Sequence, residues 1–473
     1  MATTDATDRP PKAAPYLPEE GCFDEALTAD GSPRAHYAGV LARLRAGDLE
    51  GLRRRVGEAV SARNATFGPD EEFMVDPVPR ILTAAEWREL ETGIAQRARA
   101  LNRFIADAYG EQQIFDAGIV PLRLLESSPG YESRLRGVLA PEVPAAGVAG
   151  LDVVRGPDGA FAVLEDNLRM PSGARYASVC REAVLDAVEP DTPPRPLDGY
   201  ADELLAALRA AAPEADGDPA IAVLSDGPEN TAWFEQADLA SIWGVPLVTP
   251  AQLFCERDRL YGRVGNERIE IEVLYRRSDR ERLTGSDGEP TALGEILLPP
   301  LRAGRLRCLN AFGTGIADDK LAHVYAEEMI RFYLGEDPVL PSVPAYDLAV
   351  EGADEVRKRI EELVVKPRDG MGGKGVVILP DASQRERREA IDRVAGAPGE
   401  FVAQEMVRLS THPTVSDGGL APRHVDLRPF VISAPGRTAV MRGGLTRFGA
   451  VPGEMIVNSS QGGGGKDTWV LPG

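Results

Sequence analysis

Apolar residues recur at helical spacing in two stretches near the N-terminus. They span residues 37–60 and 86–109, so each stretch is predicted to form an amphipathic helix. The last hundred residues are instead rich in predicted strands. In HVDLRPFVIS the alternation of side chains along a strand sends Leu427 to one face and Arg428 to the other. The chain is therefore predicted to combine helices with sheets.

A different pattern occupies the middle of the chain. Short apolar runs, IAVLS at 221–225, VPLV at 245–248, IEVLYRR at 271–277 and RCLN at 307–310, accompany a helical pattern over 230–244. Alternation of strands and helices predicts a small α/β lobe with a parallel sheet. The proline-rich stretch 190–196 before it is predicted to be a linker.

The stretch DPVPRIL lies between the two helical patterns. Pro77 and Pro79 hold the backbone extended, so the stretch is predicted to be a loop that presents Arg80. A lone arginine in a loop is either a surface charge or a residue that holds a substrate.

Composition narrows the class of protein. The chain has 473 residues, enough for about two or three domains, and its 43% hydrophobic and 27% charged residues are typical of a globular protein. With 53 basic and 74 acidic residues the net charge is −21, which argues against nucleic acid or an anionic membrane as the main partner. A small molecule or another protein is the expected partner.

The cysteine spacing and the lengths of the apolar runs indicate the cellular compartment. The four cysteines are far apart and form no C-x-x-C pair, which argues against a zinc site or a disulfide framework and favours a cytoplasmic location. No apolar run approaches the roughly 18 residues of a membrane span. The first residues lack the hydrophobic region of a signal peptide, and residues 1–20 are predicted to be a disordered tail.

The segment ELVVKPRDGMGGKGVVIL, residues 362–379, reads as strand, glycine loop and strand. Backbone N–H groups of a glycine-rich loop can approach an anion, and Lys366 and Lys374 add positive charge. The loop contains Gly370, Gly372, Gly373 and Gly375. This pattern predicts a flap over phosphate groups, with a plain glycine hairpin as the alternative.

A second informative segment covers residues 150–176. It reads as a hairpin of LDVV, the turn GPDG and AFAVLEDN, in which Glu165 and Asn167 share a face about 6.6 Å apart. Asp152 on the paired strand can come alongside them, while Asp166 points away. Two carboxylates and an amide oxygen suit a hard cation such as Mg²⁺, and a solvated polar face is the alternative. Arg169 follows, and it is either a residue that neutralises a phosphate or a carboxylate or an exposed arginine that does neither.

Three further patterns carry candidate chemistry. A GTG turn leads into a helix with Asp318 and Asp319 as N-terminal acids, followed by Lys320. FVAQEMV at 401–407 reads as a strand ending in Gln404 and Glu405, which is either a hinge whose backbone pairs with an adenine edge or an ordinary polar strand end. Asn458 and the glycines before Lys466 form either another anion-binding turn or a flexible loop.

Taken together, these motifs resemble the ATP-grasp superfamily. They are DDK at 318–320, VVKP with GMGGKG, AQEMV, DLRPF, Arg447 with Asn458, and LDVV with LEDN. Their order is that of the circularly permuted ATP-grasp family, which the chain resembles from about residue 22 to the C-terminus. Matching strings include DGSPRAHY, EDNLRMPSGARY, PRHVDLRPF and NSSQGGGGKDTWVL. The sequence departs from the family pattern at Gln236, where a histidine is usual, and at Asp279 and Arg280, where paired aspartates are usual.

The resemblance implies a fold and a set of roles. The fold is α/β, a circularly permuted ATP-grasp with a small parallel α/β lobe inserted mid-chain. The expected parts are a tail (1–20), a helical segment with the acidic hairpin (21–189), the α/β lobe (197–317) and the ATP-grasp lobes (318–473). ATP would contact Lys320, Lys366, Gly372, Gly373, Lys374, Gln404, Glu405, Met406 and Val407; Mg²⁺ would bind Asp152, Glu165 and Asn167; and catalysis would use Arg428, Asn458, Arg80 and Arg169.

The expected activity is that of an ATP-dependent carboxylate–amine ligase acting through an acyl phosphate. Related chemistry is that of the glutathionylspermidine synthase-like ligases, so amino acids, peptides and polyamines are the expected substrates. Arg80 and Arg169 would hold the acid. A phosphotransferase acting on a hydroxyl group and a catalytically silent nucleotide-binding partner are the alternatives, and a homo-oligomer is left open.

Overall fold

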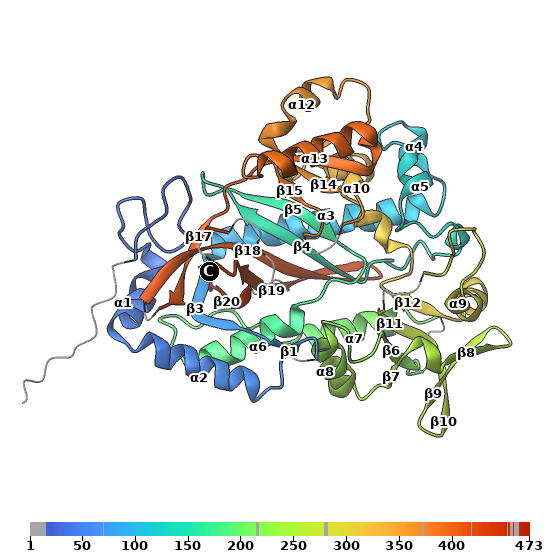
Figure 1. Cartoon of the computed structure of the whole chain (residues 1–473). Coiled ribbons are helices and arrows are strands. Elements are labelled where there is room, and N and C mark those ends of the chain that lie inside the picture. Colours follow the sequence, from blue (N-terminus) through green and yellow to red (C-terminus); the bar gives the residue numbers. More distant parts are fainter. Residues whose placement is uncertain are drawn as a thin grey trace, which may run out of the picture.

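The structure is a computed structural model that describes residues 16–69, 71–213, 217–278, 282–370, 373–417, 419–451, 453–454, 457 and 463–473. Gly372 and Asn458, together with the departures at Asp279 and Arg280, lie outside the described residues. The chain folds into helices and several separate sheets, which confirms the predicted α/β class (Figure 1). The predicted tail extends too far, because Tyr16 is already buried and donates a hydrogen bond to Asp24.

The largest sheet combines strands from both ends of the chain. Its order is β3-β20-β19-β18-β4-β5, and β17 pairs with β18 beside this path. The early strand β4 is antiparallel to the late strand β18, and β3 is parallel to β20. The strands are β3 (Val75–Leu82), β4 (Val148–Arg155), β5 (Phe161–Asn167), β17 (Thr411–Ser416), β18 (Gly419–Ala434), β19 (Arg437–Phe448) and β20 (Gly464–Val470).

Alternation along β18 explains how helices cover both faces of this sheet. Leu427 and Val431 join the core that contains α3 (Ala84–Ala108), whereas Phe430 and Ile432 join the core that contains α6 (Ala174–Leu185). A register shift between Pro429 and Val431 accommodates the proline within the strand. The sheet is therefore buried on both sides, with α6 below it in Figure 1.

A smaller antiparallel sheet of order β13-β16-β14-β15 packs above the large one (Figure 1). Its strands are β13 (Ala345–Asp347), β14 (Leu363–Pro367), β15 (Val377–Ile378) and β16 (Phe401–Glu405). The pairing of β14 with β15 confirms the predicted strand–glycine loop–strand hairpin. Helix α13 (Gln384–Gly396) contributes Ala390 and Val394 to the core of this sheet.

The middle lobe has the predicted parallel sheet, in the order β12-β11-β6-β7. Its elements are α7 (Tyr200–Ala210), β6 (Ile221–Ser225), α8 (Trp233–Trp243), β7 (Leu247–Val248), β11 (Val273–Arg277), α9 (Ala292–Arg302) and β12 (Arg307–Leu309). The sequence analysis missed an antiparallel meander of β8 (Leu253–Glu256), β9 (Arg259–Val264) and β10 (Glu267–Ile271). Its first turn places Arg257 and Asp258 at positive φ, an uncommon conformation for these residue types. The turn therefore could not be predicted from the sequence.

Two predictions near the N-terminus need correction. The pattern over 37–60 is two helices, α1 (Ala38–Ala46) and α2 (Leu49–Ser61), because Asp48 caps the second one by accepting from Gly51 N–H at 2.9 Å. DPVPRIL is not a loop but lies in β3, at the edge of the large sheet, where prolines cost no ladder hydrogen bond. The pattern over 86–109 is confirmed as α3, which starts at a capping box of Thr83 and Glu86.

The remaining elements are short. They are β1 (Thr66–Phe67), β2 (Glu71–Glu72), α4 (Gln113–Asp116), α5 (Arg123–Ser127), α10 (Lys320–Val324), α11 (Ala326–Leu334) and α12 (Asp354–Lys358), together with 3₁₀ turns at Ala35–Tyr37, Ser133–Leu135, Pro250–Gln252, Thr314–Ala317, Ile360–Glu362 and Pro398–Glu400. None of the helices in the described ranges has both the length and the apolar character that crossing a bilayer requires.

Candidate functional site

A cleft of about 740 Å³ separates the small sheet from the large one. It is lined by the acidic hairpin, the flap strands, the end of β16 and the strands β18 and β19. Twelve of the candidate residues line it: Asp152, Glu165, Asn167, Arg169, Lys320, Lys366, Gly373, Gln404, Glu405, Met406, Val407 and Arg428. Segments from both halves of the chain therefore meet at one site.

The acidic hairpin has the predicted geometry. Asp152 pairs in register with Glu165, and Gly150 pairs with Asn167. Asp166 points to the other face, where both of its oxygens accept from Arg97, at 2.6 and 2.7 Å. The strand alternation thus places three oxygen-bearing side chains on the cleft and encloses the fourth in the core.

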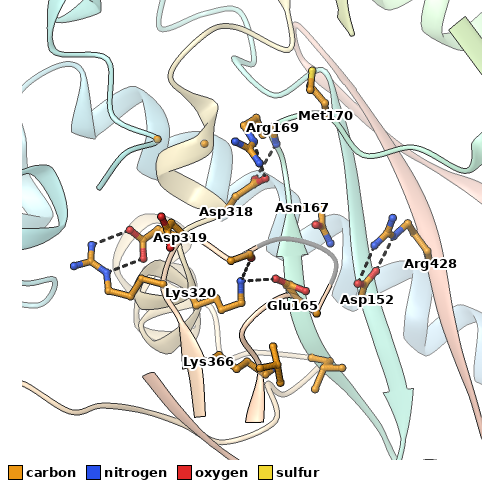
Figure 2. A pocket seen from close by; sticks show the side chains of 18 of the residues that line it. Asp152, Glu165, Asn167, Arg169, Met170, Asp318, Asp319, Lys320, Lys366 and Arg428 are labelled. Carbon is orange, nitrogen blue, oxygen red and sulfur yellow. Dashed lines mark hydrogen bonds and ion pairs between the residues drawn. The ribbon is translucent and has the colours of Figure 1, made fainter. Parts of the chain in front are cut away.

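Two arginines hold Asp152. Arg428 donates to its two oxygens at 2.7 and 2.9 Å (Figure 2). Arg447 lies 3.0 Å from the second oxygen. Burial alone would raise the pKa of Asp152, but the two guanidinium groups hold it well below its usual range. Arg447 also donates to Asp426, whose pKa is raised by burial against the effect of Arg447. The result is a buried charge cluster of two arginines and two aspartates.

Two lysines face the acidic hairpin from the other side of the cleft. Lys320 Nζ lies 3.1 Å from Glu165 Oε1 and donates to the carbonyl of Gly370 in the flap (Figure 2). Lys366 is 9% exposed, and its ammonium group forms no hydrogen bond or ion pair with another described residue. Burial lowers the pKa of Lys366 to about 8, with Lys320 lowering it further and Glu165 and Asp152 opposing the shift. An anionic ligand beside this lysine would favour its charged form and raise its pKa again.

The acidic group fits a hard cation. Glu165 and Asp152 supply carboxylate oxygens, and Asn167 lines the cleft with a buried side-chain atom, Nδ2, that has no hydrogen-bond partner among the described residues. Because the two ends of an amide are exchangeable by a flip, this orphaned position can equally present the oxygen. The donor set of two carboxylates and one amide oxygen is one that Mg²⁺ takes.

The end of β16 forms a hinge between the two sheets. Gln404 is buried, and its amide donates to the carbonyls of Leu164 at 3.2 Å and Val343 at 3.4 Å, which ties the small sheet to the large one. The backbone N–H groups of Met406 and Val407 donate to no other described residue. Apolar side chains surround this point: Leu164, Val364, Ile378 and Leu409 line the cleft. Such a slot suits a flat aromatic base with one polar edge.

Arg169 stands at the opposite end of the cleft from Lys366, with Glu165 and Asn167 between them (Figure 2). Its Nε lies 3.8 Å from Asp318, whose Oδ1 accepts from the backbone N–H groups of Leu168 and Arg169 at 2.5 and 2.8 Å. Burial raises the pKa of Asp318 to about 7, against the opposing effect of Arg169. Asp318 therefore fixes the loop after β5, whereas Asp319 is the helix-capping acid that was predicted.

Three other predictions have different outcomes. Arg80 does not reach the cleft, because it is fully buried in β3 and pairs with Glu25 at 2.5 Å. Lys374 is exposed and does not line the cleft. Lys466 does not take part in an anion-binding turn, because it is fully buried in β20 and pairs with Asp76.

Further charged residues at the cleft escaped the sequence analysis. Arg368, two residues before Gly370 of the predicted flap, donates to both oxygens of Asp319 at 3.0 and 2.8 Å. Glu132 and Arg282 line the end near Arg169. Neither lies in a glycine-rich or strand-end pattern, so no local signal distinguishes them from surface charges.

A separate group of ligand atoms lies outside the cleft. Glu19, Cys22 and His424 each offer one atom within 4.8 Å of the others, and this is the one such group of three found among the described residues. His424 is buried, and its Nδ1 lies 3.0 Å from the carbonyl of Leu409. None of the three lines the cleft.

Comparison of the sequence with known proteins finds several relatives. An uncharacterized protein of Mycobacterium tuberculosis is 40% identical over 461 residues, 95% of this chain and 84% of that protein. A protein of Synechocystis, also uncharacterized, is 38% identical over 468 residues, 95% of this chain and 97% of that protein. A Frankia casuarinae protein named "Putative glutamate--cysteine ligase 2-2" is 43% identical over 466 residues, but this chain spans only 53% of it.

A family model described as circularly permuted ATP-grasp type 2 matches residues 79–449. That span contains the acidic hairpin, the flap, the hinge and the Asp426–Arg428 strand, so the match covers the elements that build the cleft. On this evidence, the chain belongs to the circularly permuted ATP-grasp family, type 2.

Proposed function

We propose that the protein is an ATP-dependent carboxylate–amine ligase that activates its acid substrate as an acyl phosphate and releases ADP and phosphate. One observation carries the proposal: the carboxylates of Asp152 and Glu165 and the ammonium groups of Lys320 and Lys366 line the same cleft. A nucleotide triphosphate needs cationic side chains for its oxygens and acidic side chains for its metal ion. Membership of the ATP-grasp family supports ATP as the nucleotide.

The adenine is expected between the apolar side chains at the hinge, with its edge toward the N–H groups of Met406 and Val407. Lys320 and Lys366 would contact the phosphates, and the flap from Gly370 to Gly375 would close over them. The roles of Gly372 and Asn458 are part of the proposal, whereas Lys374 is exposed and does not line the cleft.

Asp152, Glu165 and Asn167 would hold Mg²⁺, which offsets the negative charge of the phosphates when it is bound. Arg428 would stabilise the transferring phosphoryl group, because negative charge spreads over its oxygens in the transition state. In the ligand-free chain Arg428 is already oriented by its two hydrogen bonds to Asp152. Asp152 thus positions this arginine as well as offering a metal ligand.

In the proposed reaction, a carboxylate oxygen of the acid bonds to the γ-phosphorus while the bond to the bridging oxygen of ADP breaks. The amine nitrogen then attacks the acyl carbon, phosphate leaves with the bonding electron pair, and the amine loses its proton to solvent. Activation matters because a free carboxylate is a poor electrophile. Arg169, on the far side of Glu165 from Lys366, is the candidate for holding the acid.

The relatives support a ligase over a phosphotransferase. Two Frankia proteins similar to this chain carry glutamate–cysteine ligase names, although this chain spans only 53% and 56% of them. The name describes each whole protein, so it supports the class of reaction here and not the identity of the substrates.

The test is incubation with ATP, Mg²⁺ and a panel of amino acids, short peptides and polyamines, with ADP release and product mass as readouts. We expect ADP release that depends on an acid and an amine, and a product of their combined mass less one water. A phosphorylated alcohol without any amide would refute the ligase and favour a phosphotransferase. Nucleotide binding without ADP release, with an affinity indifferent to Asp152→Asn, would favour a silent nucleotide-binding partner.

A further inference from the structure

The cleft continues past Arg169 to a polar end that the nucleotide does not require. We call this the far end and define it by Gly130, Glu132, Arg169, Arg282 and Gly315, all of which line the cleft. It is walled by the loops 128–132 and 312–315, which belong to different parts of the chain. Lys366 lies at the opposite end of the cleft from Arg169 (Figure 2).

The far end is a built structure. Tyr109, which ends α3, joins its two loops: the Tyr109 hydroxyl donates to the carbonyl of Gly313 at 3.0 Å and accepts from Glu132 N–H at 2.8 Å. The loops touch at two glycines, since a Cβ on Gly315 would lie 3.1 Å from Gly130 Cα. The same Cβ would lie 3.2 Å from Arg169 Cδ, so the Arg169 side chain lies against the contact between the two loops. Gly130, on one side of this contact, is two residues before Glu132.

Glu132 carries an unmet hydrogen-bonding group. The residue is only 4% exposed, and its Oε1 accepts from Leu283 N–H and from Arg282 Nε, both at 3.2 Å. Its other oxygen, Oε2, is buried and has no hydrogen-bond partner among the described residues. A buried carboxylate oxygen without a partner is costly, and the cost is recovered when a ligand donates to it.

Resting on the function proposed above, we infer that the far end binds an amino acid. The ammonium group of the amino acid donates to Glu132 Oε2, and its carboxylate lies among the guanidinium groups of Arg169 and Arg282. A cationic donor is favoured because hydrogen bonds between charged groups are the stronger ones. The inference names the substrate class of the acid-binding part of the cleft.

The charges at this end argue against the other expected substrates. A polyamine would bring several cations to a wall that already holds Arg169, Arg276 and Arg282. A dicarboxylic acid without an amine would leave Glu132 Oε2 unpaired and close to its own negative charge. An amino acid carries both an ammonium group for Glu132 and a carboxylate for the arginines. Phe67 and Met170 offer apolar surface in the same cleft for the rest of the molecule.

Measuring the affinity of amino acids for the protein tests this inference without requiring the enzyme to turn over. Each of the twenty proteinogenic amino acids would be titrated into the whole chain by calorimetry, with and without saturating ADP and Mg²⁺. For the amino acids that bind, we expect the N-acetyl derivative, which lacks the ammonium charge, to bind at least about tenfold more weakly. Failure of all twenty to bind, or equal binding of the N-acetyl derivatives, would overturn the inference.

A pair of variants addresses the residue itself. Glu132→Gln keeps the oxygen that accepts from Leu283 but removes the charge, so amino-acid binding should weaken about 10-fold to 100-fold while ADP binding is unchanged. The matched control is Glu289→Gln, because Glu289 also pairs with an arginine, Arg134, at 3.0 Å but is exposed and outside the cleft. Full amino-acid affinity in a folded Glu132→Gln variant would refute the assignment. ADP that fails to bind even the unmodified chain would count against the proposed nucleotide function instead.

Discussion

Affinity for ADP should fall between pH 7 and pH 9, and Lys366→Arg should remove this fall. Lys366 has a pKa lowered to about 8 because burial disfavours its charged form and Lys320 adds repulsion, against the attraction of Glu165 and Asp152. A nucleotide phosphate needs the charged form. Above about pH 8, binding therefore has to be accompanied by uptake of a proton at Lys366 Nζ.

The magnitude follows from the shift. Lowering the pKa from 10.5 to about 8 corresponds to about 3.4 kcal/mol of unfavourable charging in the empty cleft. With a pKa near 8, about 90% of Lys366 is charged at pH 7 and about 10% at pH 9. The affinity should therefore weaken about tenfold over this interval, which corresponds to about 1.4 kcal/mol.

The assay is calorimetric titration with ADP in metal-free buffers that differ in ionisation enthalpy. Uptake of about half a proton per ADP is expected near pH 8, where Lys366 is half charged. Lys366→Arg remains charged throughout and reports the contribution of the ADP phosphates themselves. Lys358→Arg, at an exposed lysine, should behave like the unmodified chain. Constant affinity and no proton uptake in the unmodified chain would show that Lys366 does not meet the phosphates.

Three further substitutions separate activity from stability. Glu165→Gln should reduce ADP formation at least about 100-fold but change the free energy of unfolding by under about 1 kcal/mol, because Glu165 is partly exposed and its only ion-pair partner among the described residues is Lys320; an undiminished rate would contradict its metal role. Arg97→Met should destabilise the fold by about 3–5 kcal/mol, seen in thermal unfolding, since buried Asp166 loses both guanidinium hydrogen bonds and keeps the contact with His323 at 2.7 Å. Lys366→Met should raise the ligand-free unfolding temperature at pH 7, and this gain should vanish toward pH 10.5, because between pH 8 and 10.5 the unfolded chain binds more protons and the unmodified fold gains stability.

Features that depend on neighbouring residues could be predicted from the sequence. The strand period of two places Glu165 and Asn167 on the cleft and Asp166 in the core, as the structure confirms. The glycine-rich stretch between two β-branched runs predicted the flap hairpin of β14 and β15. In both cases a few residues contain the whole signal, because a hairpin is stabilised within its own segment.

Features that depend on distant partners could not be predicted. Arg80 looks like a loop residue until β3 pairs with β20 at the other end of the chain and Glu25 meets its guanidinium. Glu132 sits in an unremarkable polar stretch, and its orphaned oxygen depends on contacts with Tyr109 and Leu283. Burial and pairing of a charge are properties of the assembled fold, and no local pattern encodes them.

The difference between local and long-range features also explains why a circularly permuted chain still builds the site. The acidic hairpin of β4 and β5 and the flap hairpin of β14 and β15 each form from one continuous segment, so neither depends on its place in the chain. Their relative position is then set across the large sheet, where Leu427 pairs with Val153 and thereby brings Arg428 within hydrogen-bonding distance of Asp152. A sheet register needs only that two strands lie side by side, whichever comes first. Opening the chain elsewhere therefore preserves the charges that face each other across the cleft.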